Sequence, residues 1–227
     1  MLKKSLLAII TFQLLSFHVL SDESLDEQRN KLIICIYSKK HGNTDANLLK
    51  LLKSNMDLNF IEKGYRQLTP LIYAAEAEKI GTLKILLDAG AKIDFRDNYK
   101  QTALFYAVET GNLSIVKFLL EKGAKLNLKD EVGETPFFIG AQKGHYDVLK
   151  LLIKHGAKIN AISLFKETAL DSVIRQKRIL KQEVKNHPHM YSNFGIDHIK
   201  KYDKMISFLK KCGVKKAKEL PKSKKTK

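Results

Sequence analysis

Three histidines near the C-terminal end of the chain come nearest to a metal-binding pattern. His187 and His189 form a His-x-His step, and His198 follows nine residues after His189. Imidazoles at such spacing can bind zinc or copper. A structural zinc site, however, also needs cysteine or acidic ligands at suitable spacing, and none accompanies these histidines. We therefore favour solvent-facing histidines in a loop over a metal site.

The sequence contains none of the short motifs that mark common catalytic sites. There is no phosphate-binding loop, no Gly-x-Gly-x-x-Gly, no His-Glu-x-x-His and no Gly-x-Ser-x-Gly. The two cysteines are too far apart to form a Cys-x-x-Cys pair, and two are too few for a disulfide scaffold. We expect a non-enzymatic protein with no catalytic residue, no cofactor and no metal.

Positive charge is concentrated in the last quarter of the chain. The 227 residues carry a net charge of +17, and residues 172–227 hold 17 Lys and Arg against 4 Asp and Glu, or +13. A strongly basic region attracts acidic proteins, anionic membranes and nucleic acids. The candidate polyanion-binding residues are Arg175, Lys177, Arg178, Lys181, Lys200 and Lys201.

The final residues, 214–227, are rich in lysine and poor in apolar side chains, so we expect this tail to be disordered. Three functions fit it. The tail can dock on an anionic membrane or on nucleic acid without sequence preference, it can attract an acidic protein, or it can direct a secreted effector to the nucleus of a host cell. The alternative is a tail that only improves solubility.

The first 21 residues have the layout of a secretory signal peptide. Lys3 and Lys4 precede an apolar run from Leu6 to Leu20, and Ser21 suits cleavage after it. We therefore expect a secreted or periplasmic protein. Two alternatives are a membrane anchor and a hydrophobic first helix, although the run is shorter than the roughly 20 residues that span a bilayer.

A period of 33 residues runs through the middle of the chain. Similar segments begin at Thr69, Thr102, Thr135 and Thr168, and a Gly-Ala pair follows each of the first three threonines by 21 residues. Each unit predicts a threonine-capped helix and then an amphipathic helix that ends at glycine. Because one unit cannot bury its apolar face alone, the units must stack into an all-α solenoid.

The pattern resembles the ankyrin repeat family, whose unit combines a β-turn, Thr-Pro-Leu-His-x-Ala, two antiparallel helices and Gly-Ala. The match is clear over residues 69–171. The resemblance implies about five repeats with short turn fingers. We expect a degenerate N-terminal capping repeat at residues 25–59 and ankyrin repeats at 60–213, the last of them with an insertion.

Two departures from the family pattern carry structural expectations. The motif histidine, which in the family links neighbouring turns by hydrogen bonds, is replaced by Ile72, Phe105, Phe138 and Asp171. We therefore expect hydrophobic packing to hold the repeats together. The turn glycine survives only as Gly133, and the equivalent positions hold Gln67, Lys100 and Lys166. Since these residues resist the conformation of a turn glycine, we expect less regular turns.

The last repeat contains an insertion. Its terminating glycine is Gly213 rather than a residue near 189, which adds about 24 residues, placed about 177–200. Apolar side chains keep helical spacing on both sides of Asn186-His187-Pro188, and the residue before a proline resists the helical conformation. We expect a long antiparallel helical hairpin with a loop near 187–195, whose basic outer face caps the solenoid.

The resemblance implies an interaction module that binds a protein partner through its turn tips and first-helix face, and we expect a monomer. The aromatic residues among the candidates either contact the partner or pack along the stack of turns, and the sequence leaves both readings open. The identity of the partner is not encoded in any motif. The candidate protein-binding residues are Tyr65, Arg66, Leu68, Asn98, Tyr99, Gln101, Glu131, Val132, Glu134 and Phe165.

Overall fold

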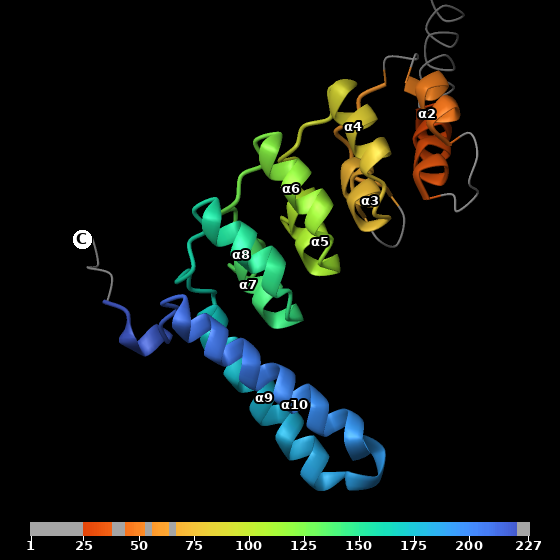
Figure 1. Cartoon of the computed structure of the whole chain (residues 1–227). Coiled ribbons are helices and arrows are strands. Elements are labelled where there is room, and N and C mark those ends of the chain that lie inside the picture. The colour runs from red at the N-terminus through yellow and green to blue at the C-terminus, as the bar shows by residue number, and fades with distance from the viewer. Residues whose placement is uncertain (1–24, 38–43, 53–55, 64–66, 222–227) are drawn as a thin grey trace, which may run out of the picture.

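The computed structural model describes residues 25–37, 44–52, 56–63 and 67–221. After a helix over residues 25–37, the elements are α2 (Thr44–Leu52), α3 (Pro70–Glu76), α4 (Ile80–Asp88), α5 (Ala103–Thr110), α6 (Leu113–Glu121), α7 (Pro136–Lys143), α8 (Tyr146–Lys154), α9 (Ala169–Asn186), α10 (Pro188–Lys211) and η1 (Ala217–Glu219). Helix pairs stack along one row, and the long α9–α10 pair projects from its C-terminal end (Figure 1). No strand occurs among the described residues. The predicted all-α solenoid with a helical hairpin in its last repeat is confirmed.

Three of the four repeat threonines cap the first helices through their side chains, whereas the buried Thr102 hydroxyl at the start of α5 makes no capping hydrogen bond. The Thr69 hydroxyl accepts a hydrogen bond from the backbone N–H of Ile72 at 3.1 Å, and Thr135 accepts one from Phe138 at 3.4 Å. Thr168 forms a reciprocal pair with Asp171, whose carboxylate accepts from the Thr168 N–H at 3.1 Å. These bonds satisfy backbone donors that have no partner within a helix.

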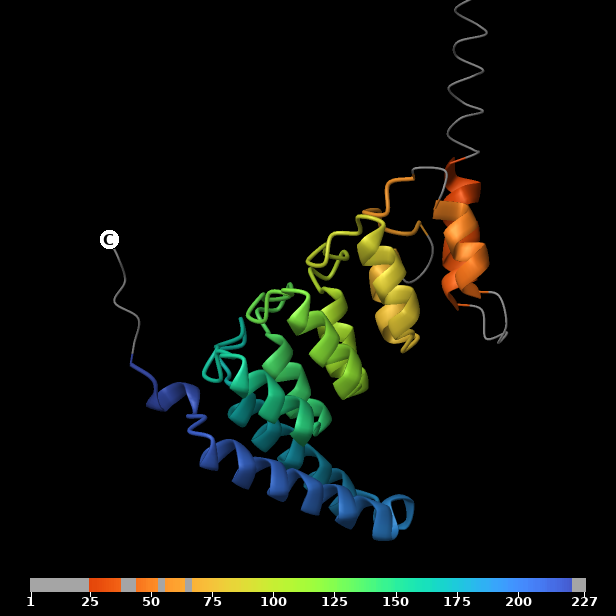
Figure 2. The same cartoon turned by 45° about the horizontal axis from the view of Figure 1, so that its top comes forward.

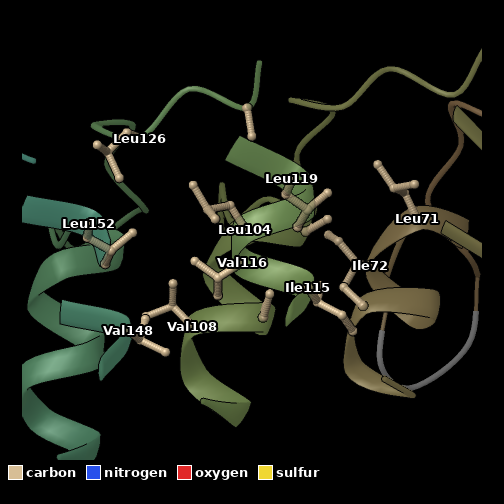
Figure 3. Packing of buried hydrophobic residues seen from close by; sticks show 14 of the residues in the cluster. Leu71, Ile72, Leu104, Val108, Ile115, Val116, Leu119, Leu126, Val148 and Leu152 are labelled. Carbon is tan, nitrogen blue, oxygen red and sulfur yellow. The ribbon is translucent and has the colours of Figure 1, made fainter. Parts of the chain in front are cut away.

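Apolar side chains between successive repeats form one continuous core. Ile72, Phe105 and Phe138, which replace the motif histidine, are 0%, 1% and 2% exposed. Figure 3 shows the buried side chains of α5 and α6 lying between those of α3 on one side and α8 on the other. Each repeat therefore covers the apolar face of its neighbour, as the histidine replacements predict.

A second connection between repeats, which the sequence reading missed, uses short polar side chains. Asp94, Asn127 and Asn160 each lie four residues after a helix-ending glycine. Their Oδ1 atoms accept hydrogen bonds from backbone N–H groups of the next repeat, at Lys125 (2.9 Å), Lys158 (2.7 Å) and Lys215 (2.7 Å). The recurring Lys, apolar residue and Asp or Asn after each helix-ending Gly-Ala pair is the signal that could have revealed this ladder.

The expectation of irregular turns is wrong. Gln67, Lys100, Gly133 and Lys166 all adopt the left-handed conformation, with φ of 50°, 60°, 80° and 59°. Lys100, Gly133 and Lys166 each donate their N–H to the carbonyl three residues earlier, at 3.0 to 3.1 Å. The hydrogen bonds of the turn thus hold non-glycine residues in a conformation that they resist when unconstrained.

The sequence separation between the bonded residues of the ladder gives the length of the insertion in the last repeat. Asn127 bonds Lys158, 31 residues later, whereas Asn160 bonds Lys215, 55 residues later. The difference of 24 residues is accommodated by the longer α9 and α10. The expected loop at 187–195 is wrong, because α10 already begins at Pro188 and only His187 separates the helices. Proline disrupts a preceding helix but also suits the first position of a new one.

The chain remains ordered beyond residue 213, so the predicted disorder from residue 214 is wrong for residues 214–219. Val214 is buried, and η1 follows it. The Ala217 N–H donates to the Asp171 carboxylate at 2.7 Å, and the Thr168 hydroxyl donates to the Lys215 carbonyl at 2.8 Å. Asp171, at the motif-histidine position, therefore fixes the C-terminal segment. Residues 222–227 of the predicted tail lie outside the described residues.

Replacing Asn127 with alanine tests the ladder. The change removes the bond to Lys158 and a second bond, at 3.3 Å, from Asn127 Nδ2 to the Gly156 carbonyl. We expect the free energy of unfolding in urea to fall by about 1 kcal/mol. The control is Gln182→Ala, because among the described residues Gln182 bonds Asn186 of its own helix and no other repeat. Equal losses in the two variants would contradict the ladder.

Opposite substitutions test the turn conformation. Gly133→Ala places a Cβ at φ +80° and 3.0 Å from the Leu164 nitrogen, so we expect a loss of about 1–2 kcal/mol in the free energy of unfolding. Lys100→Gly removes a Cβ from the same conformation and should gain about 0.5 kcal/mol. Calorimetric melting of both variants measures the two signs. If Lys100→Gly destabilises as much as Gly133→Ala, the assignment of a shared strained turn fails.

Candidate functional site

The tips of successive turns are joined into one continuous edge. Tyr99, Val132 and Phe165 occupy the same place in three turns, 33 residues apart. The Glu131 N–H donates to the Tyr99 carbonyl at 2.9 Å, and the Leu164 N–H donates to the Val132 carbonyl at 2.8 Å. The turns that precede α5, α7 and α9 consequently lie along one side of the solenoid (Figure 2).

This edge presents apolar side chains to solvent. Tyr99 is 52% exposed, Phe165 is 67% exposed and Leu164 is 72% exposed. Tyr99 and Phe165 therefore project outward instead of packing along the stack of turns. We call Tyr99, Val132, Ile162, Leu164 and Phe165 the apolar edge.

Buried aspartates brace the turns beneath the apolar edge. Asp97 Oδ1 accepts from the Gln101 N–H at 2.8 Å, and Asp130 Oδ1 accepts from the Glu134 N–H at 2.8 Å. The last turn has Ser163 at this place, and its buried hydroxyl makes no hydrogen bond. The Ser163 N–H donates to the Glu167 carbonyl at 2.9 Å, as the Asp97 and Asp130 N–H groups do to Gln101 and Glu134, so this turn keeps the backbone bonds and lacks the aspartate bond. The exposed side chains of the apolar edge are thus attached to turns whose backbone is held by hydrogen bonds.

The other predicted protein-binding residues have different environments. Asn98 and Glu131 are exposed on the turns, and Asn98 donates to Gln67. Leu68 is buried in the core, so its assignment to the surface is wrong: it lies on the inner side of the turn rather than at its tip. Tyr65 and Arg66 lie outside the described residues.

Polar side chains of the first helices form rows beside the apolar edge, again at intervals of 33 residues. One row consists of Glu76, Glu109, Gln142 and Arg175. The Lys143 ammonium lies 2.8 Å from the Glu109 carboxylate, and Arg175 donates to both carboxylate oxygens of Glu167 at 2.9 to 3.2 Å. Their spacing in the sequence gives no reason to pair these residues.

Three carboxylates lie at the junction of the apolar edge and the first-helix face, and we call Asp130, Glu134 and Glu167 the acidic cluster. Gln142 Nε2 donates to Glu134 Oε1 at 3.3 Å, and Gln101 Nε2 donates to Asp130 Oδ2 at 3.2 Å. Burial, and secondarily the nearby charge of Asp130, raises the pKa of Glu134 to about 7. Among the described residues no lysine or arginine forms an ion pair with Glu134, although the nearby Arg175 guanidinium, which pairs with Glu167, opposes the rise in the pKa of Glu134.

The predicted polyanion-binding residues do not form one uniform surface. Arg175 pairs with Glu167 on the first-helix face, Lys177 pairs with Asp203 across the hairpin, and Lys200 lies 3.3 Å from Asp197. These partners neutralise half of the predicted set. Arg178, Lys181 and Lys201 are exposed on the hairpin.

Neither a metal centre nor a membrane span is found in the described part of the chain. His187 is exposed where α9 and α10 meet and His198 is half-buried, while the side chain of His189 lies outside the described residues. Among the residues described, no group of three His, Cys, Asp or Glu could hold a metal ion, and no helix is long and apolar enough to cross a membrane. The predicted signal peptide lies outside these residues.

The pKa of Glu134 gives a pH-dependent prediction. Its folded-state pKa, about 7, exceeds the value of 4.5 taken for an unperturbed glutamate, so the carboxyl destabilises the fold increasingly as pH rises from 4.5 through 7. Glu134→Gln keeps the acceptor for Gln142 and removes the charge. We expect it to raise the free energy of unfolding more at pH 8 than at pH 5, by about 1 kcal/mol.

Urea unfolding at both pH values measures this difference. Glu131→Gln, a change at an exposed carboxylate of the same turn, is the matched control. The same pH-dependent gain in both variants would show that the effect belongs to net charge and not to the buried position of Glu134.

Comparison with known proteins agrees with this geometry. The family model described as ankyrin repeats (3 copies) matches residues 32–130 and 80–163, together more than half of the chain. No curated protein matches the chain significantly. The matched region contains α3 to α8 and the first two of the three turns that form the apolar edge. The chain belongs to the ankyrin repeat family.

Proposed function

We propose that this protein is an exported, non-enzymatic module that holds a protein partner against its turn tips and first-helix face. Ankyrin repeats are generally protein-interaction modules. The observation that carries the proposal for this surface is the exposure of Tyr99, Leu164 and Phe165 on turns that backbone bonds hold in line. Aromatic side chains in such positions commonly provide most of the energy of an interface.

The order of the turns before a partner binds favours binding. A flexible loop loses conformational entropy when a partner orders it, and this loss subtracts from affinity. Here the bonds from Glu131 to Tyr99 and from Leu164 to Val132 already fix the turns. The apolar side chains are therefore presented at low entropic cost.

Export is supported by the sequence of residues 1–21 alone. Cleavage after about Ser21 would release the solenoid into the periplasm or the medium. Retention of the segment would tether the same binding surface to a membrane.

A second candidate function uses the hairpin as an electrostatic adaptor. The exposed Arg178, Lys181 and Lys201 support it, because no acidic partner within the described chain neutralises them. A truncation after Pro221 removes the terminal lysines and keeps the docked Val214 and Ala217. Loss of heparin or anionic-vesicle binding by this variant would assign the binding to the terminal lysines, whereas retained binding would support the hairpin as the adaptor.

Alanine substitutions test the proposed binding surface. We expect Phe165→Ala and Tyr99→Ala each to weaken the complex with a cross-linked and identified partner by about 2 kcal/mol, or roughly 30-fold in Kd. Neither change should lower the melting temperature, because both side chains project into solvent. Calorimetric titration and thermal melting measure the two quantities.

Leu113→Ala provides the matched control. Leu113 is an exposed apolar residue, 43% exposed, but it lies on α6, a second helix. We expect its removal to leave the affinity unchanged. Lost stability with unchanged affinity in Phe165→Ala, or an equal loss of affinity in Leu113→Ala, would reject the turn-tip surface.

A further inference from the structure

One side of α10 has no described element packed on it. Helix α10 belongs to the pair that ends the row of repeats (Figure 1). Its buried residues Met205 and Leu209 join the common core, and its Phe208 ring meets the Tyr146 ring of α8 edge-on, with centroids 5.5 Å apart. The opposite side of the helix is left to solvent in the described part of the chain.

Lysines follow this uncovered side and continue beyond the end of the helix. Lys200, Lys204 and Lys211 are exposed, and their intervals of four and seven residues bring them within about 40° of one another around the helix axis. More lysines come from the last turn of α10 and from the segment that follows it. We call this surface the C-terminal face, and it consists of Ile196, Lys200, Lys204, Lys210, Lys211, Lys215, Lys216 and Lys218.

The C-terminal face stays positive when every charged residue around it is counted. Residues 188–221 contain eight lysines, no arginine and three acidic residues, a net charge of +5. The neighbouring segments are positive as well. Residues 146–160 hold three lysines and one aspartate, and residues 169–186 hold five basic and two acidic residues. No adjoining part of the surface therefore neutralises the face.

Ion pairs engage few of these lysines. Lys200 lies 3.3 Å from Asp197, and Asp203, the other acidic residue of α10, pairs with Lys177 of α9. Cations in the last turn of α10 also stabilise that helix, but this role does not extend to lysines beyond its end. Within the described residues, the lysines of the face that have no ion pair are Lys204, Lys210, Lys211, Lys215, Lys216 and Lys218.

An open pocket of about 400 Å³ lies where α10 ends. Its lining combines the side chains of Lys210, Lys215 and Lys216 with the buried Leu170 and Val214. Ammonium groups and apolar side chains in one pocket match a ligand that carries an anionic group beside hydrocarbon. The pocket is thus a second feature, besides the charge of the face, that indicates a ligand.

The carboxylates near the pocket are engaged by backbone groups. Glu219, which also lines the pocket, accepts from the Lys216 N–H at 3.1 Å, and Asp171 accepts from the Ala217 N–H at 2.7 Å. Neither forms an ion pair with a lysine in the described part of the chain. These bonds hold the segment that forms one wall of the pocket, and the ammonium groups in the lining remain available for an anion.

Three features of the face favour a lipid surface over nucleic acid. Residues 188–221 contain no arginine, the side chain best suited to bidentate contacts with nucleic-acid phosphates. The described aromatic side chains of α10, Tyr202 and Phe208, are half-buried and therefore not free to stack on bases. Ile196 is 49% exposed and lies one turn before Lys200. An apolar side chain beside lysines suits the boundary between lipid headgroups and acyl chains.

We propose that the C-terminal face docks on an anionic phospholipid membrane, with a lipid phosphate bound among Lys210, Lys215 and Lys216. The inference rests on the electrostatic adaptor, the second candidate function, and specifies its ligand and its position. It does not depend on the turn-tip surface. Each lysine held near an anionic bilayer strengthens binding about fivefold, so the unpaired lysines of the face suffice for stable docking.

Co-sedimentation of the full chain with two kinds of vesicle tests the proposal. One kind contains phosphatidylcholine alone, and the other contains phosphatidylcholine mixed with phosphatidylglycerol. The readout is the ratio of the two affinities, because any contribution of the apolar residues 1–21 is common to both. We expect at least tenfold tighter binding to the anionic vesicles, weakening as salt is raised. Equal affinities would overturn the proposal.

Charge variants locate the docking face. The triple variant Lys210→Gln, Lys215→Gln and Lys216→Gln should lose most of the preference for anionic vesicles. Its control carries Lys84→Gln, Lys100→Gln and Lys166→Gln, which remove the same charge from exposed lysines elsewhere and should retain the preference. Thermal melting verifies that both variants fold. Equal losses in the two variants would show a response to net charge alone and would overturn the proposal.

Amide NMR spectra test the pocket itself. Short-chain phosphatidylglycerol, added below its micelle concentration, should shift signals of residues 210–219, and short-chain phosphatidylcholine should not. Equal shifts with both lipids, or no shift in this segment, would overturn the assignment of the pocket.

Two further comparisons separate the possible failures. If Arg178→Gln with Lys181→Gln abolishes the preference for anionic vesicles and the C-terminal triple variant does not, the adaptor stands and the C-terminal face is wrong. If neither variant changes it, both are wrong. Binding of duplex DNA that the triple variant loses, without any preference for anionic vesicles, would show that the ligand is nucleic acid. Phe165→Ala should leave vesicle binding unchanged, so the turn-tip surface is tested separately.

Discussion

The apolar face of each helix pair is removed from water only when the next pair stacks on it. Ile72, Phe105 and Phe138 hold the same buried position in three consecutive repeats, so each first helix must lie in register with its neighbour. Residues 33 positions apart consequently form rows on the outside of the solenoid. The apolar edge and the acidic cluster are surface consequences of this buried register, because neither exists within one isolated repeat.

The stacking also explains why the turns retain a regular shape without glycine. Lys100 and Lys166 adopt left-handed conformations because hydrogen bonds within the turn and to the next turn outweigh the local strain. A site built on these turns is ordered before a partner arrives. The same logic holds at the C-terminal end, where Asp171 and the Asn160 ladder bond dock a lysine-rich segment whose composition alone indicates disorder.

The sequence was sufficient for features that depend on local pattern, such as the helix starts at Thr69 and Thr135 and the stacked core, but it left open whether Phe165 is exposed or packs along the turns. The sequence was insufficient for features that depend on contacts between residues far apart in the chain. The conformational preference of proline is compatible with Pro188 lying in a loop or at the first position of a helix, so it does not decide between the two. The pairing of Arg175 with Glu167 and the raised pKa of Glu134 require neighbours that only stacking brings together. The ladder of Asp94, Asn127 and Asn160 was visible as a repeat, but its function depended on the spacing between repeats.

Site-specific photo-cross-linking tests the central claim most directly. A benzoylphenylalanine introduced in place of Phe165 would lie on the apolar edge, and one in place of Lys117 would lie on the exposed side of α6. With the partner present, position 165 should form a single adduct and position 117 should form none. Mass spectrometry of the adduct should then identify the segment of the partner that contacts the apolar edge. An adduct formed at position 117 but not at 165 would contradict the account.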